Sequence, residues 1–189
     1  MGDVTEKKSM DLVRMAVARA RTIEPLPTQT YIPKTQALIV GGGVAGMTAA
    51  LSIADQGFKV HLVERTGELG GNLRKVKETA EGLKPLELLK KIESEITANK
   101  NIALYLNSEV EECSGFVGNF KSRIKTGSNG SSKTVEFEHG AAIIATGAGE
   151  YNAQEFLHNA NKKVFTQMEL EAKLEEDKEF ANKLNEVVM

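Results

Sequence analysis

The segment GGGVAG at positions 41–46, which has glycine at all three fixed positions of a GxGxxG pattern, is the part of the sequence best suited to chemistry. Gly41 permits a tight turn at the end of a strand, and at Gly43 a side chain would occupy the space of a bound pyrophosphate. Gly46 lets the following helix pack closely on that strand. The free N–H groups at the start of a helix favour negative charge. The spacing therefore predicts a site for the pyrophosphate of a dinucleotide.

A carboxylate follows at Glu64, 23 residues after Gly41, where about 20 are expected before a ribose-binding acid. Its oxygens can accept both hydroxyls of an adenosine ribose, and its charge disfavours the 2′-phosphate of NADP. The neighbouring Arg65 weakens that exclusion, because a guanidinium could bind such a phosphate or lie along the adenine. Glu64 could also be a solvated acid at a strand end, and Arg65 a solvated cation.

Two further motifs favour FAD over NAD, which shares the first half of this site. Gly70-Gly71, followed by Asn72 and Arg74, lies six residues after Glu64. A second glycine pair with accessible backbone suits a long cofactor whose pyrophosphate and ribityl chain run across the sheet edge. The segment 145–147 (Ala-Thr-Gly) directly follows an apolar run, and its small residues let the chain approach the cofactor closely.

The elements that would position these residues alternate between strands and helices. Short apolar runs at 37–40 and 141–145 are typical of buried parallel strands. The other elements expected around them are a helix at 44–56, a strand at 58–64, a helix from Pro85 to about 99 and a strand at 102–106. Short alternating stretches between 109 and 137, around a turn at 127–132, predict two or three antiparallel strands. The predicted fold class is α/β, a Rossmann-like FAD-binding domain with a parallel sheet and a small antiparallel β insertion.

The N-terminal part of the sequence differs from the rest. Residues 9–21 have apolar side chains at helical spacing and predict an amphipathic helix with a basic face. Three prolines in 22–35 indicate an extended connector. We therefore expect residues 1–35 to form a helix and linker, and residues 36–189 to form the FAD-binding domain.

The C-terminal part carries two expectations. Thr166 and Glu169 have the spacing of a capping box, which predicts the start of a last helix. Val187-Val188-Met189 is interpreted as the first half of a buried strand, so that the domain is expected to be truncated at its C-terminus.

Composition excludes several classes of protein. The 189 residues are 41% apolar and 26% charged, with a formal net charge of -2, which is typical of a soluble globular domain. No basic excess exists to bind nucleic acid, and the longest apolar runs fall far short of the ~20 residues that span a bilayer. The lack of a hydrophobic signal at the N-terminus predicts a cytoplasmic protein.

No side chain in the sequence indicates protein-based catalysis or a metal site. The single cysteine, Cys113, excludes an internal disulfide, a CxxC redox pair and a cysteine-bound iron–sulfur cluster within these residues. We expect Cys113 to be a small buried apolar residue. The histidines His61, His139 and His158 are scattered, and none pairs at metal-ligand spacing. Redox chemistry would therefore come from a flavin.

Five segments carry a resemblance to a known family. They are 11–20 (DLVRMAVARA), 41–50 (GGGVAGMTAA), 68–74 (ELGGNLR), 114–120 (SGFVGNF) and 166–170 (TQMEL). In these segments the sequence resembles the two-dinucleotide-binding-domain flavoproteins and, more closely, the A subunit of heterodisulfide reductase. The resemblance extends over about residues 9–189.

The resemblance implies FAD, several iron–sulfur clusters, and electron transfer among protein partners, which in methanogens includes flavin-based bifurcation. The implied partners are the other redox subunits of a heterodisulfide-reductase-like complex. The residues expected to hold FAD are Gly41, Gly43, Val44, Ala45, Gly46, Glu64, Arg65, Gly70, Gly71, Asn72, Arg74, Val110, Ala145, Thr146 and Gly147. Cluster cysteines, a second GxGxxG and a late Gly-Asp motif are missing from these residues, which fits a fragment that is incomplete for turnover.

Two other functions stay open from the sequence. The chain could be an NAD-binding domain of a dehydrogenase, or a cofactor-free interaction module with a Rossmann-like core. In the second case the helix at 9–21 and the acidic segment around 171–177 would be docking surfaces. The presence of all three glycine motifs counts against the empty module.

Overall fold

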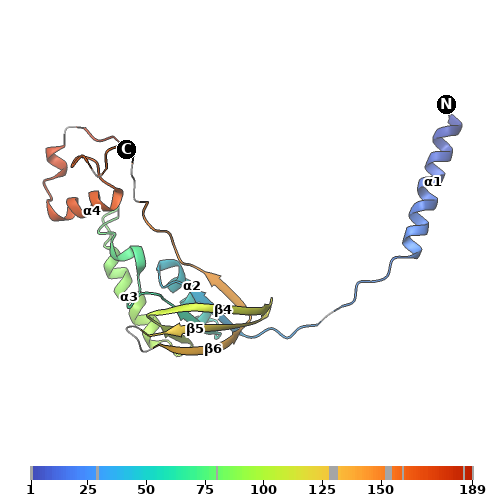
Figure 1. The fold of residues 1–189 in the computed structure, drawn as a ribbon, viewed down its shortest axis with the longest axis horizontal. Coiled ribbons are helices and arrows are strands. Elements are labelled where there is room, and N and C mark those ends of the chain that lie inside the picture. Colours follow the sequence, from blue (N-terminus) through green and yellow to red (C-terminus); the bar gives the residue numbers. More distant parts are fainter. Residues whose placement is uncertain are drawn as a thin grey trace. The chain divides into compact units, whose positions relative to one another are not determined.

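The computed structural model describes residues 2–28, 30–79, 81–127, 132–151, 155–158, 160–184 and 186–188. The chain divides into two units, Met1–Tyr31 and Ile32–Met189. In the first unit, α1 (Gly2–Arg21) contains the predicted helix and begins earlier than expected (Figure 1). Its side chains are exposed from Val4 onward. Arg19 and Arg21 lie in the last turn, where positive charge is favourable to the helix dipole.

A parallel sheet forms the centre of the second unit. Its strands are β1 (Gln36–Val40), β2 (Lys59–Val63), β3 (Ile102–Tyr105) and β7 (Ala141–Ile144), in the spatial order β3-β2-β1-β7. Val40 pairs in register with both Val63 and Ile144, so β1, β2 and β7 end at the same edge of the sheet. Ligands of open α/β sheets bind at this carboxyl edge.

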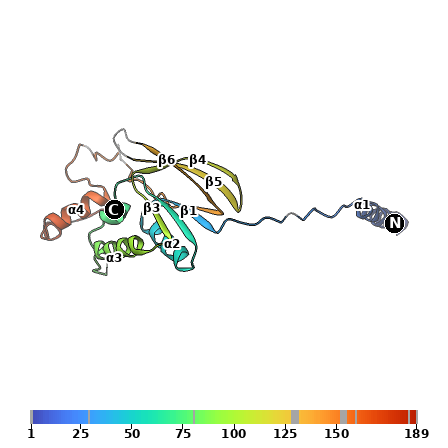
Figure 2. The ribbon, with the colours of Figure 1, turned by 90° about the horizontal axis from the view of Figure 1, so that it is seen from below.

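Two helices cover one face of the parallel sheet, and a second sheet covers the other (Figure 2). The helices are α2 (Val44–Asp55) and α3 (Pro85–Ala98). On their side, Ile39 of β1 packs with Met47 of α2 and Leu89 of α3 in a buried cluster. On the other side, Leu38 packs with Ile124 of the second sheet. Because successive side chains of β1 point to opposite faces, one short apolar strand serves both layers.

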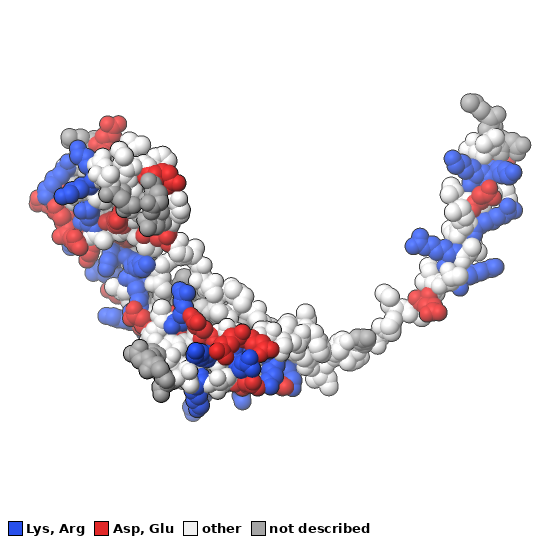
Figure 3. Space-filling model, viewed as in Figure 1, with Lys and Arg blue, Asp and Glu red and all other residues white. Residues whose placement is uncertain are grey.

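The second sheet is antiparallel, with the order β4-β5-β6. Its strands are β4 (Ser108–Phe116), β5 (Asn119–Thr126) and β6 (Lys133–His139). The predicted fold class, α/β with a small antiparallel insertion, is confirmed. Of the predicted turn at 127–132, residues 128–131 lie outside the described residues. Acidic and basic side chains intermix over this sheet (Figure 3), as in the pair Arg123–Glu112 at 2.6 Å.

The C-terminal segment contains α4 (Gln167–Glu176), whose predicted capping box is confirmed. The Glu169 N–H donates to Thr166 Oγ1 at 3.3 Å, and Glu169 Oε2 accepts from the Thr166 N–H at 2.8 Å. Two short 3₁₀ helices, η1 (Gly71–Arg74) and η2 (Ala181–Lys183), complete the elements described. Within the described parts of the chain, no helix has the length and apolar character needed to cross a membrane.

Two sequence expectations are wrong. Cys113 is exposed, not buried. It follows the irregularity between Val110 and Glu112 in β4, and all residues from Glu111 to Phe116 are exposed. Val187 and Val188 form no strand and are 55% and 89% exposed, because neither sheet of the structure pairs with them.

His61 of β2 lies between the two sheets. Its ring stacks on Phe137 of β6 with 3.9 Å between centroids, and its Nε2 lies 3.0 Å from Gln36 Oε1. Burial, followed by the charges of His139 and Lys59, lowers the pKa of His61 to about 4. The folded state therefore holds a neutral imidazole in this layer.

We expect His61 to make the folded state less stable in acid. In the unfolded chain its pKa is near 6.5, so the unfolded state binds more protons between pH 6.5 and 4, and the free energy of unfolding falls as the pH is lowered through that window. A difference of one bound proton between the two states changes the free energy of unfolding by at most about 1.4 kcal/mol per pH unit. Because His61 is only half-buried, we expect less than half of that slope.

Urea unfolding between pH 7 and pH 4.5 measures this effect. His61→Gln, which keeps a polar side chain but does not titrate, should show a shallower dependence on pH than the parent chain. Equal slopes for the two proteins would contradict the assignment, since the carboxylates titrate in both.

Candidate functional site

One cavity lies at the carboxyl edge of the parallel sheet, where β1, β2 and β7 end. Its volume is about 680 Å³. The residues that line it are Gly41, Gly43, Val44, Ala45, Glu64, Arg65, Thr66, Glu68, Gly70, Gly71, Asn72, Leu73, Arg74, Lys75, Ala145, Thr146, Gly147, Ala148 and Gly149. This is the place at which a Rossmann-like fold binds its ligand.

The glycines at the three fixed positions of the GxGxxG pattern, Gly41, Gly43 and Gly46, have different surroundings. Gly41 has φ +110°, and a Cβ there would overlap the carbonyl oxygen of Ala145. A Cβ at Gly46 would overlap the carbonyl oxygen of Gly41. At Gly43 a Cβ would meet no protein atom within 4 Å. Gly41 and Gly46 therefore permit close packing, whereas Gly43 keeps part of the cavity open.

The N-terminus of α2 faces this open space. Gly43 is its N-cap and supplies no capping side chain, and its first turn contains no acidic residue. The first helical hydrogen bond runs from the Met47 N–H to the Gly43 carbonyl at 2.9 Å. The N–H groups ahead of it have no acceptor within the helix, and two of those residues, Val44 and Ala45, line the cavity. The arrangement suits an anion such as a pyrophosphate.

Glu64 stands at the end of β2 on the wall of the cavity. Its Oε2 accepts from the Gly42 N–H at 2.6 Å, and its Oε1 accepts from the Thr66 N–H at 2.7 Å. Burial acts to raise the pKa of Glu64, but these bonds, the Thr66 hydroxyl and the charge of Arg65 together lower it below its usual value. Glu64 is therefore a carboxylate at neutral pH and can accept hydrogen bonds from hydroxyl groups.

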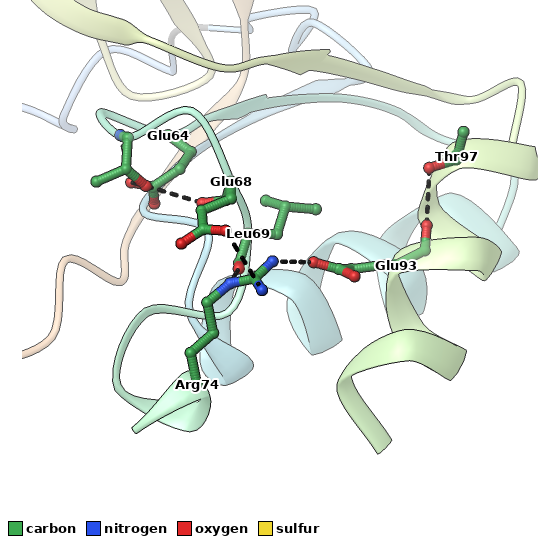
Figure 4. A network of polar contacts seen from close by, with 7 residues as sticks. Glu64, Glu68, Leu69, Arg74, Glu93 and Thr97 are labelled. Carbon is green, nitrogen blue, oxygen red and sulfur yellow. Dashed lines mark hydrogen bonds and ion pairs between the residues drawn. The ribbon is translucent and has the colours of Figure 1, made fainter. Parts of the chain in front are cut away.

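The 68–75 loop forms another wall. The Gly70 N–H donates to the Gly42 carbonyl at 2.8 Å, which holds the loop beside the first glycine segment. Arg74 reaches Glu93 of α3 with Nη2 at 2.6 Å from Oε1, and it also bonds to the carbonyl of Leu69 (Figure 4). Its Nη1 lies 3.4 Å from Glu68 Oε2. Arg74 thus lines the cavity, while its guanidinium ties the loop to α3.

All the residues predicted to hold the cofactor line this cavity except Gly46 and Val110. Gly46 is buried against the turn at Gly41, and Val110 packs against the interior cluster of Leu38, Val63 and Ile124. The sequence interpretation missed six lining residues: Thr66, Glu68, Leu73, Lys75, Ala148 and Gly149. Thr66 could have been found from its place two residues after a strand-end acid, where a hydroxyl and N–H can bond back to the carboxylate.

The fold and the cavity define a class of protein. Residues 36–188 match the family described as FAD dependent oxidoreductase, and the chain belongs to this family. The family's cofactor is FAD, which confirms the expectation of FAD over NAD at the level of the family.

Two relatives show which kind of protein within this family the chain resembles. Over 120 residues the chain is 40% identical to the A subunit of the H(2):CoB-CoM heterodisulfide,ferredoxin reductase of Methanothermobacter marburgensis, covering 63% of this chain and 18% of the relative. It is 42% identical over 127 residues to a protein of Archaeoglobus profundus that is named as similar to the heterodisulfide reductase A subunit, covering 63% and 17%. The resemblance to this subunit of heterodisulfide reductase is confirmed. The chain spans less than a fifth of the length of these relatives.

Solved structures with the same fold are named as dehydrogenases and reductases. The thioredoxin reductase of Lactococcus lactis superposes with a TM-score of 0.51 at 25% identity, covering 68% of this chain and 41% of that one. The L-proline dehydrogenase of P. horikoshii also gives 0.51, at 24% identity, covering 63% and 24%. The second likeness shows the fold alone.

The residues present fit an FAD molecule in its adenosine diphosphate half. The helix N-terminus suits the pyrophosphate, the open side of Gly43 leaves room for it, and Glu64 can accept from a ribose hydroxyl. The lining side chains are otherwise small, polar or charged, with Val44 and Leu73 as the large apolar ones and no aromatic ring among the residues found at the cavity.

Proposed function

We propose that this chain is the FAD-binding part of an electron-transferring oxidoreductase that corresponds to the A subunit of heterodisulfide reductase. One observation carries the proposal. At the carboxyl edge of the parallel sheet, a single cavity is lined by the N-terminus of α2, by Gly43, where a Cβ would meet no protein atom, and by the ionised carboxylate of Glu64. The 40% identity to one such subunit supports the choice among flavoproteins.

Each part of the site would have a distinct task. Val44 and Ala45 offer backbone N–H groups to the pyrophosphate, and Glu64 accepts from the adenosine ribose. Asn72 bonds to the Ala148 carbonyl at 3.1 Å, which holds the 145–149 segment over the cavity. When bound, FAD supplies electron-transfer chemistry that no side chain here provides, and the protein supplies binding and electrostatics.

The names of several relatives support a proposal about the partners of this chain. Two of them are named as A subunits of heterodisulfide reductases, one of Methanothermobacter marburgensis and one of Methanosarcina acetivorans. We propose that other redox subunits of such a complex, in the cytoplasm, are the partners of this chain. A relative from Methanopyrus kandleri is named an iron-sulfur subunit. With Cys113 as their single cysteine, the 189 residues cannot hold a four-cysteine cluster.

We also propose that residues 1–35 form a helix and linker, and that residues 36–189 form the FAD-binding domain.

Ligand titrations test this function. We expect FAD and ADP to bind with affinities within about tenfold of each other, because the residues lining the cavity serve the adenosine diphosphate half and offer no aromatic slot for the flavin ring. At 100 times its dissociation constant each ligand should add about 2.7 kcal/mol of stability, which raises the melting temperature by roughly 5–10 °C. NAD should bind no more tightly than FAD.

Other outcomes point to the alternatives. Stabilisation by NAD with none by FAD would identify a nicotinamide-binding domain. No shift with FAD, ADP or NAD would favour the cofactor-free interaction module. An FAD affinity far above that of ADP would show that these residues already bind the flavin ring.

A further inference from the structure

The Glu64 carboxylate is held at both of its oxygens by neighbouring groups of the chain. Oε2 accepts from the Gly42 N–H at 2.6 Å. Oε1 accepts from the Thr66 N–H at 2.7 Å, and the Thr66 hydroxyl oxygen lies 2.8 Å from it. Two of the three donors therefore belong to one residue, which stands two positions after the acid.

The Thr66 hydroxyl has a choice of acceptors. It lies 2.8 Å from Glu64 Oε1 and 2.8 Å from the carbonyl oxygen of Glu68, and its single proton can serve one of them at a time. Bonds to an ionised acceptor are about twice as strong as neutral ones. Because Glu64 is ionised, the proton goes to the carboxylate.

These bonds determine which acceptor position of the Glu64 carboxylate stays free for a ligand. A carboxylate has about four acceptor positions. The bonds from Thr66 occupy both positions on Oε1, and the bond from Gly42 occupies one on Oε2. The remaining position lies on Oε2, the oxygen that is bonded to the first glycine segment.

We propose that Thr66 is a positioning residue that fixes the Glu64 carboxylate so that Oε2 receives a hydroxyl of the adenosine ribose. The proposal rests on the proposed function of the cavity and deepens it. Thr66 lines the same cavity and is exposed, so its hydroxyl is not needed to fill the core. Without that hydroxyl one of the three bonds that orient the carboxylate is lost, while the backbone N–H bond remains.

Thr66→Val tests the proposal, because valine has nearly the same shape and lacks the hydroxyl. We expect the affinity for ADP to fall about three- to tenfold, the range typical of one hydrogen bond. The affinity for inorganic pyrophosphate should stay unchanged, since pyrophosphate uses the helix N-terminus and has no ribose. Thr66→Ser should restore ADP binding. Thr97→Val on α3, outside the cavity, is the matched control and should bind both ligands like the parent chain.

Calorimetric titration of the four proteins with the two ligands separates the outcomes. An unchanged ADP affinity in Thr66→Val overturns the proposal, as does an equal loss for ADP and pyrophosphate, which would report general damage to the cavity. Failure of Thr66→Ser to recover binding also overturns it. If the parent chain binds no ADP, the proposed function itself fails, and that result is distinct from normal parent binding with an unaffected Thr66→Val.

Discussion

Gly43→Val is expected to abolish binding of ADP and FAD while the fold survives. A Cβ at Gly43 meets no protein atom within 4 Å, and φ -74° with ψ -179° is extended backbone that valine adopts readily. The branched side chain would instead occupy the cavity at the start of α2, where we place the pyrophosphate. We expect a loss of at least about 100-fold in affinity, equivalent to roughly 2.8 kcal/mol. The loss of a glycine N-cap should cost about 1 kcal/mol of stability.

Calorimetry with ADP and a thermal melt of the ligand-free protein measure the two quantities separately. Thr48→Val is the matched control: it places the same side chain on α2 at an exposed position outside the cavity. It should bind ADP like the parent chain. Retention of parent-like affinity by Gly43→Val would show that the glycine segment does not bind the phosphates.

Most of the fold was predictable because local patterns and tertiary packing agree in this chain. The apolar run at 37–40 has no polar face, and a strand with no polar face must be covered on both sides. The structure supplies those covers as α2 and α3 on one side and the antiparallel sheet on the other. The errors lie where tertiary packing alone determines burial: the sequence around Cys113 does not reveal that no other described element covers this part of β4, whose residues are exposed.

The site was predictable to the extent that it depends on backbone spacing. Glycine spacing and the acid at the end of the second strand located the cavity, because both follow from the geometry of a strand, a turn and a helix. Contacts between distant side chains were not predictable. Arg74 was expected among the residues that hold FAD, and the spacing gave no sign of its bond to Glu93, 19 residues further along the chain. Nor could the sequence show that Val110 faces the interior.

Gly41→Ala is expected to destabilise the fold itself before any ligand is added, whereas Gly43→Val acts mainly on ligand binding. Gly41 has φ +110°, a conformation that alanine adopts only under strain, and its Cβ would overlap the carbonyl oxygen of Ala145. That oxygen belongs to backbone that cannot move freely, because the Ala145 N–H donates to the Val40 carbonyl at 2.8 Å. Alanine must therefore separate the ends of β1 and β7 or distort the turn.

The expected cost of Gly41→Ala is the sum of two effects, backbone strain of about 1–3 kcal/mol and overpacking of about 1–3 kcal/mol. For a chain of this size that corresponds to a fall in melting temperature of roughly 10 °C. Gly149→Ala is the control, because Gly149 lines the same cavity and has no positive φ. A Cβ at Gly149 would meet no atom within 4 Å. The melting temperature of this variant should change by less than about 2 °C. A thermal melt of both variants without ligand decides the matter. If Gly41→Ala melts like the parent chain, the close approach of β7 to the first glycine is not part of the folded state, and the wall that residues 145–149 give the cavity is lost with it.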